Sequence, residues 1–242
     1  MIAALLLFGT MALLAPFGAL IAFPWTLITR NPAFLYGAGI RIVRIGTRLA
    51  GIRVTVLGRS TVPRDRHCIF MCNHVSNLDP CVMVPPIPGR CSILVKQELM
   101  RVPILGPAMR MANFVSVSRA GDRQSAMDSV KQAVAALHSG VHILVYPEGT
   151  RSRTGRLLPF KRGPFYLALE SGAPIIPMTV TGTENMMQKG SMRVLPGTAT
   201  VHFHEAVNPA DYDGPDALLT AVRERIRSVL PQHMQPLETA TS

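Results

Sequence analysis

A histidine and an aspartate stand five positions apart in a polar loop that follows an apolar, strand-like run. The loop, residues 73–80, has the sequence NHVSNLDP and contains His74 and Asp79. An imidazole with one ring nitrogen held by a carboxylate can accept a proton at the other nitrogen. The pair is therefore a candidate general base with its orienting partner, without a protein nucleophile. In the alternative, Asp79 only caps a helix that Pro80 begins, and His74 is an exposed loop residue.

A second candidate site follows another strand-like run, residues 142–146. The next five residues are PEGTR, and the stretch from Gly149 to Leu169 contains no acid. Its basic residues are Arg151, Arg153, Arg156, Lys161 and Arg162. A guanidinium offers a planar fork to phosphate oxygens, and interspersed glycines let backbone amides approach closely. The stretch predicts a phosphate pocket, with a solvated basic loop as the alternative.

Both loops need a scaffold, which the rest of the chain supplies as alternating short elements. Strand-like runs occupy residues 53–57, 67–72, 91–95, 114–118, 142–146, 175–180 and 200–204. Helix-like stretches occur near residues 80–86, 97–111, 122–139, 163–171 and 215–230. This alternation predicts one α/β domain, residues 53–242, with a mostly parallel central sheet of about seven strands flanked by helices. In such sheets chemistry gathers at the carboxyl ends of the strands.

The N-terminal part of the chain separates apolar residues from basic ones. Residues 1–29 carry no charge, whereas residues 30–66 contain eight arginines and a single acid, Asp65. Basic flanks after an apolar run are typical of membrane proteins. The run exceeds a signal-peptide core of ~7–15 residues and has no basic residue before it. We expect residues 1–52 to be a membrane anchor, either one span or two shorter re-entrant helices bent at Pro16 and Pro24.

Residues 40–52 combine arginines with an apolar stripe at helical spacing. The arginines are at positions 41, 44 and 48, and the stripe is Ile42, Ile45, Leu49 and Ile52. This pattern predicts a basic amphipathic helix for an anionic lipid surface, or else an ordinary surface helix packed on the domain. With a net charge of +11, the whole chain favours anionic partners: nucleic acid, anionic lipid or a phosphorylated substrate.

The remaining reactive residues show weaker patterns. The four cysteines lack paired C-x-x-C spacing, so we expect small buried hydrophobic side chains in a reducing cytoplasm, without a structural disulfide or zinc site. Cys72 is the one conceivable covalent nucleophile. His202 and His204, followed by Glu205, share one face of a strand but lack an obvious third metal ligand, so we expect a structural role.

The two loops, in this order, resemble the glycerolipid acyltransferase superfamily, and specifically the 1-acylglycerol-3-phosphate (lysophosphatidic acid) acyltransferases. The resemblance runs from about Gly58 to Thr183. The family's N-H-x-x-x-x-D block corresponds to Asn73, His74 and Asp79, and its E-G-T-R block to residues 148–151. A fourth block is similar to residues 175–180. A middle block corresponds to Lys96, Glu98, Leu99, Pro103, Gly106 and Arg119. Ser118 stands where that block usually has Asp, which leaves the acceptor open.

The resemblance implies a membrane-bound acyltransferase. It would move a fatty acyl chain from acyl-CoA or acyl carrier protein to the sn-2 hydroxyl of lysophosphatidic acid, forming phosphatidic acid, with His74 as general base and Asp79 orienting it. The implied substrate-binding residues are Asn73, Lys96, Arg119, Glu148, Gly149, Thr150 and Arg151. The resemblance calls for no metal or other cofactor. The separation of apolar and basic residues in the N-terminal part, rather than the resemblance, leads us to expect the cell inner membrane, with the catalytic domain on the cytoplasmic face and an anionic membrane surface as partner.

Two other functions fit parts of the sequence. One keeps the chemistry but uses another lysolipid acceptor, such as a lyso-ornithine lipid. The other is a non-catalytic basic protein that binds membranes or nucleic acid. A protein that binds only by charge would not need His74, Asp79 and the intact block at 148–151, so we expect no nucleic-acid partner.

Overall fold

The computed structural model describes residues 1–117, 123–188 and 190–237, and its centre is a six-stranded sheet. Along the sheet the strands are β1 (Ile52–Leu57), β8 (Gly197–Phe203), β7 (Ile175–Thr181), β2 (Ile69–Cys72), β6 (Val141–Val145) and β3 (Arg90–Ile93). All neighbours are parallel except β7 and β8. The predicted α/β fold with a mostly parallel sheet is confirmed.

The described part of the predicted run 114–118, residues 114–117, does not join this sheet. Within it, β5 (Ser116–Val117) pairs in parallel with β4 (Val95–Lys96) to form a separate two-stranded sheet. The run 91–95 divides because β3 ends at Ile93, and the chain then leaves β6 to pair with β5. The central sheet therefore has six strands rather than about seven.

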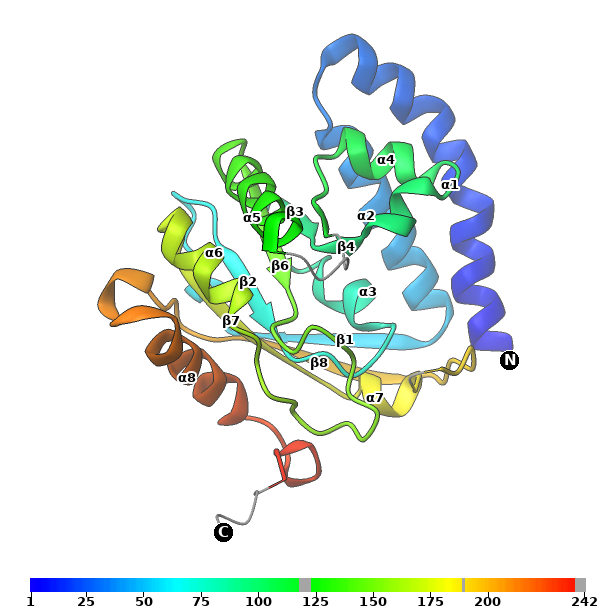
Figure 1. Cartoon of the computed structure of the whole chain (residues 1–242). Helices are drawn as coiled ribbons and strands as arrows, with labels where there is room; N and C mark the ends of the chain where they lie inside the picture. The colour runs from blue at the N-terminus through cyan, green and yellow to red at the C-terminus, as the bar shows by residue number, and fades with distance from the viewer. Residues whose placement is uncertain (118–122, 189, 238–242) are drawn as a thin grey trace.

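Helices cover both faces of the sheet (Figure 1). On one side lie α5 (Arg123–His138), α6 (Gly163–Ser171) and α8 (Gly214–Arg227). On the other lie α3 (Asp79–Met83) and the N-terminal helices. The short α7 (Thr183–Met186) follows β7. Because both faces are covered, β2 and β6 consist entirely of buried residues, as expected of central parallel strands.

The predicted helix 97–111 is interrupted. The structure has a 3₁₀ turn, η2 (Gln97–Arg101), and then α4 (Leu105–Met111). Pro103 lies between them, and Ile104 has a φ of 64°, outside the helical region. Other 3₁₀ turns are η1 (Arg59–Thr61), η3 (Pro209–Asp211) and η4 (Gln232–Met234).

The N-terminal segment forms a helical hairpin of α1 (Ile2–Thr29) and α2 (Ala33–Leu49) (Figure 1). Because α1 is continuous through Pro16 and Pro24, it does not divide into two shorter helices. The helices pack closely at glycines: a Cβ on Gly46 would lie 3.1 Å from the carbonyl oxygen of Leu7. By length and composition α1 could cross a membrane, and its mean hydropathy is 2.2 with little of it buried. This exposed apolar helix suggests membrane association.

The amphipathic helix is longer at its start and shorter at its end than predicted. It ends at Leu49 because Gly51 adopts a φ of 74° and Ile52 begins β1. Ile45 and Leu49 remain 42% and 53% exposed. The helix is thus packed against α1 and still exposes part of its apolar stripe.

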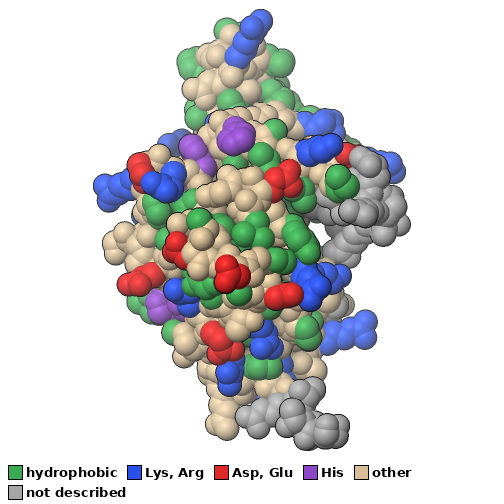
Figure 2. All heavy atoms as spheres, turned by 60° about the vertical axis from the view of Figure 1, so that its left-hand side comes forward, with side chains coloured by type: hydrophobic (Ala, Val, Ile, Leu, Met, Phe, Trp, Pro, Cys, Tyr) green, Lys and Arg blue, Asp and Glu red, His purple; other side chains and the backbone are tan. Residues whose placement is uncertain are grey.

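The side of the molecule that carries α5, α6 and α8 has a mixed charge, unlike the basic residues 30–66. Figure 2 turns that side forward and shows acidic and basic side chains interspersed. The excess positive charge of the chain is instead concentrated in residues 30–66.

Candidate active site

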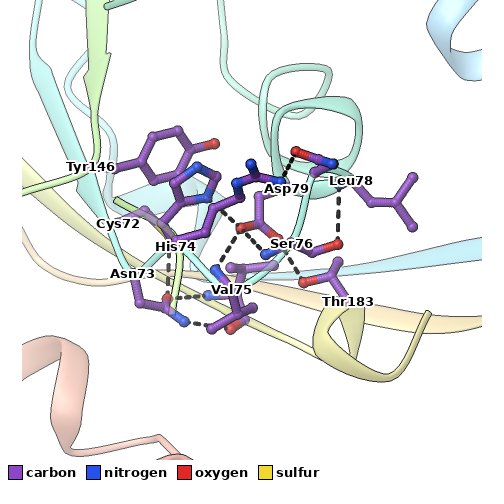
Figure 3. A network of polar contacts seen from close by, with 12 residues as sticks. Cys72, Asn73, His74, Val75, Ser76, Leu78, Asp79, Tyr146 and Thr183 are labelled. Carbon is purple, nitrogen blue, oxygen red and sulfur yellow. Dashed lines mark hydrogen bonds and ion pairs between the residues drawn. The ribbon is translucent and has the colours of Figure 1, made fainter. Parts of the chain in front are cut away.

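The candidate base lies in the loop between the carboxyl end of β2 and α3 (Figure 3). His74 Nδ1 is 2.7 Å from Asp79 Oδ2. The same carboxylate oxygen accepts hydrogen bonds from the backbone N–H groups of Val75 and Ser76, at 2.8 and 2.9 Å. Asp79 is fully buried, so these donors replace the water that its charge would otherwise need.

The second oxygen of this carboxylate is held by a residue that sequence reasoning missed. The hydroxyl of Thr183, at the start of α7, donates to Asp79 Oδ1 over 2.6 Å, and Thr183 is fully buried (Figure 3). Thr183 follows the predicted strand 175–180, so a hydroxyl at a strand end was the available signal. The bond ties the His74 loop to the segment that follows the carboxyl end of β7.

These contacts define the tautomer of His74. Because Asp79 Oδ2 accepts from two backbone amides, the carboxylate acts as an acceptor, and Nδ1 of His74 carries the hydrogen. Nε2 then has a free lone pair, and the side chain is 17% exposed. The Tyr146 ring stacks on the imidazole, with centroids 3.9 Å apart and planes 15° from parallel. The imidazole is thus fixed in orientation and reachable, as a general base requires.

Glu148 connects the two predicted loops through the backbone of His74. Its Oε1 accepts from the His74 N–H over 2.7 Å, and its Oε2 from the Leu158 N–H over 3.0 Å. The Ser152 N–H in turn donates to the His74 carbonyl oxygen over 2.8 Å. Burial, opposed by these hydrogen bonds, raises the pKa of Glu148 to about 7. The stretch around Glu148 therefore positions His74.

The raised pKa of Glu148 predicts a pH dependence of stability. The folded protein binds this proton more tightly than the unfolded chain, whose Glu pKa is near 4.5. The stabilising effect is thus complete below pH 4.5 and is lost as the pH rises through about 7. Over this interval the free energy of unfolding should fall less for Glu148→Gln than for the wild type. The difference between the two declines should be about 3 kcal/mol at most. Urea titrations of both proteins at pH 4.5 and 8 measure the difference; equal declines would contradict the assignment.

The other residues of the E-G-T-R block line the outside of this arrangement. Arg151 donates from its guanidinium to Asn77 Oδ1, in the His74 loop. Gly149 has a φ of 68°, and a Cβ there would approach Lys161 Cε to 2.9 Å. Gly149 and Thr150 are exposed. The structure therefore places Arg151 beside the His74 loop.

One predicted substrate-binding residue, Asn73, is placed differently. Asn73 is buried, and its side-chain amide exchanges hydrogen bonds with the backbone of Val180 in β7, at 2.8 and 2.9 Å. It thus faces the sheet. Lys96 lies in β4, in the separate small sheet, and Arg119 lies outside the described residues.

The cysteines are free thiols, and Cys72 is poorly suited to be a nucleophile. It is fully buried, and its Sγ donates to Asn73 Oδ1 over 3.3 Å. Burial, with the nearby Asp79 and Glu148 carboxylates, raises the pKa of the Cys72 thiol well above its ordinary value. Nucleophilic attack needs the thiolate.

His202 and His204 contact each other and the neighbouring strand. The rings of His202 and His204 stack with centroids 4.5 Å apart, and His204 Nε2 lies 2.8 Å from Thr179 Oγ1. Burial lowers the pKa of His204 to about 4. Within the described ranges, no three His, Cys, Asp or Glu side chains gather as a metal site would require.

A family model described as Acyltransferase matches residues 53–181, a range that includes the His74 loop. A 1-acyl-sn-glycerol-3-phosphate acyltransferase of Cocos nucifera is 31% identical over 90% of this chain and 70% of its own. The alpha form of Homo sapiens is 35% identical over 74% of this chain and 62% of its own. The chain belongs to the 1-acyl-sn-glycerol-3-phosphate acyltransferase family.

A solved structure shares the fold. It is the 1-acyl-sn-glycerophosphate acyltransferase PlsC of Thermotoga maritima, with a TM-score of 0.80 over 93% of this chain and 92% of that one. The sequence identity is 23%.

Proposed function

We propose that this enzyme transfers a fatty acyl chain from acyl-CoA or acyl carrier protein to the sn-2 hydroxyl of lysophosphatidic acid, forming phosphatidic acid, with His74 as general base. The observation that carries the proposal is the 2.7 Å contact between His74 Nδ1 and the buried Asp79 carboxylate, which leaves Nε2 available. The names of the relatives support the acceptor. Thiol release from acyl-CoA on addition of lysophosphatidic acid tests it.

The proposed reaction proceeds by direct attack. Nε2 of His74 takes the proton of the acceptor hydroxyl as its oxygen attacks the thioester carbonyl carbon. The tetrahedral intermediate collapses, the C–S bond breaks, and the imidazolium returns the proton to the departing thiolate. Asp79 stabilises the imidazolium through the 2.7 Å contact and fixes the ring. The acceptor hydroxyl is itself the nucleophile, so no acyl-enzyme forms.

The acceptor phosphate is proposed to bind at Arg151, with Lys96 and Arg119 as further cations of the same pocket. Phosphate oxygens would take the place of Asn77 Oδ1 on the guanidinium. Gly149 and Thr150 would form the wall of this pocket. Held in this way, the acceptor would keep its hydroxyl at a fixed distance from His74.

Two of the predicted substrate-binding residues receive a positioning role instead. Glu148 accepts from the backbone N–H of His74, and Asn73 joins the start of the loop to Val180. Both are buried, so they orient the base rather than touch the acceptor.

Arg151→Ala is expected to weaken the use of lysophosphatidic acid, mainly through a higher KM, by about tenfold to a hundredfold. Arg151→Lys should restore only part of this loss, because lysine lacks the planar fork. Steady-state kinetics over a series of acceptor concentrations measure both. An equal loss with an acceptor that lacks phosphate would show that Arg151 acts structurally.

We propose that residues 1–52 anchor the enzyme and that residues 53–242 carry the chemistry, at the cell inner membrane with the catalytic domain on the cytoplasmic face. The apolar α1 and the arginines that follow it support this orientation, since cytoplasmic flanks collect basic residues. The acceptor is a lipid, so an anchor would hold the pocket near its substrate.

Deleting residues 1–29 is expected to convert attachment from salt-resistant to salt-sensitive. The arginines of residues 30–66 attract anionic lipid only within a Debye length of about 8 Å at physiological salt. The truncated protein should therefore sediment with anionic vesicles at low salt and remain in solution at high salt. Sedimentation at both salt concentrations measures this, with the full chain as control. If the truncated protein still sediments with vesicles at high salt, residues 30–242 insert into the membrane without α1.

A further inference from the structure

A cleft of about 1030 Å³ lies apart from the His74 loop, between α2, α3 and the edge of the sheet formed by β1 and β8. Figure 1 shows α2, α3, β1 and β8, the elements that contribute its lining. Its cationic lining consists of Arg44, Arg48, Arg53 and Arg59, and no acidic side chain lines it. None of these arginines forms an ion pair with an acid in the described part of the chain.

Placing four arginines around one cleft is unfavourable unless an anion joins them. Arg44 donates to the carbonyl oxygen of Pro85 over 2.6 Å, which fixes one of these side chains. Part of the lining is apolar: Val54 and Val56 of β1 belong to it and are each 37% exposed. The cleft therefore combines cationic side chains with exposed apolar ones, which suits a phosphate attached to an apolar body.

We infer that this cleft binds the phosphate headgroup of an anionic phospholipid. Two of its arginines, Arg44 and Arg48, come from α2, which packs on the exposed apolar helix α1. A ligand in the cleft thus lies beside the element that suggests membrane association. A soluble phosphorylated ligand would gain nothing from this location.

This lipid site is distinct from the acceptor pocket proposed above. On α3, Cys81 and Val82 line the cleft. The first residue of this helix, Asp79, instead contacts His74. Arg151 belongs to another loop and does not line the cleft. The bound phospholipid is therefore neither acceptor nor donor, and it holds the enzyme on anionic regions of the bilayer.

Binding of short-chain lipids to the full-length protein in a nonionic detergent tests the inference. Dihexanoyl phosphatidylglycerol, which is anionic and has no lysolipid hydroxyl, should bind more tightly than zwitterionic dihexanoyl phosphatidylcholine by isothermal titration calorimetry. The double variant Arg48→Gln, Arg53→Gln should lose about tenfold or more in affinity for the anionic lipid. The matched double variant Arg41→Gln, Arg64→Gln removes the same charge outside the cleft and should change it less than twofold. Arg59→Gln is a second test should the double variant not fold.

Three results would overturn the inference. Equal losses in the cleft and control variants would mean diffuse attraction to surface charge. Equal affinity of the wild type for both lipids would mean that the cleft does not select a headgroup with net negative charge. If CoA binds more tightly than the anionic lipid, and its binding depends in the same way on Arg48 and Arg53, the cleft belongs to a soluble phosphorylated ligand. Because the readout is lipid binding, each result is independent of whether His74 is the base.

Discussion

Replacing His74 with alanine is expected to reduce acyl transfer by about 10²- to 10⁴-fold while leaving the protein folded. The side chain is partly exposed, and its ring contacts are the stacked Tyr146 and the Asp79 carboxylate. Its loss therefore removes the proton acceptor but little packing. The turnover number of the purified variant, measured by thiol release, gives the effect.

The matched control is His138→Ala, because His138 is an exposed residue at the end of α5, away from the His74 loop. We expect full turnover from it. Circular dichroism should show the same fold for the wild type and both variants. A His74→Ala protein that keeps more than a few per cent of turnover would mean that another group takes the proton.

Asp79→Asn is expected to lower kcat by about 10³- to 10⁴-fold, because it removes the charge that stabilises the imidazolium. The asparagine fits the site: its amide oxygen can accept from the donors that now meet Oδ2, and its NH₂ can face Thr183, whose hydroxyl can turn to accept. The loss should therefore appear in kcat rather than in folding.

The control for this variant is Asp216→Asn, which removes a carboxylate from an exposed ion pair with Arg162. Exposed pairs of this kind stabilise proteins little, so activity and thermal stability should hardly change. If Asp79→Asn folds normally and retains more than a tenth of the wild-type kcat, the carboxylate does not assist the base.

The pairing of His74 with Asp79 could be predicted because it is local. Both residues lie in one short loop, Pro80 after Asp79 marks a helix start, and the backbone amides of the same loop, at Val75 and Ser76, donate to the buried carboxylate. The apolar N-terminal helix could also be predicted, because the uncharged residues 1–29 and the basic residues 30–66 are separated along the chain itself.

The partners of this pair could not be predicted, because they depend on which strands are neighbours. Thr183 reaches Asp79 and Val180 reaches Asn73 because β7 pairs with β2, although about a hundred residues separate them in sequence. Tyr146 stacks on His74 because β6 is the other neighbour of β2. No local pattern encodes this strand order.

The most direct test of the central claim measures thiol release from acyl-CoA together with the lipid product formed from each acceptor. The acceptors are lysophosphatidic acid, lyso-ornithine lipid and lysophosphatidylcholine, each offered to the purified full-length enzyme. We expect phosphatidic acid in equal amount to the released thiol, lysophosphatidic acid as the preferred acceptor, and thiol release from the His74→Ala variant that is slower by about a hundredfold or more. Thiol release that needs lyso-ornithine lipid and does not occur with lysophosphatidic acid would contradict it.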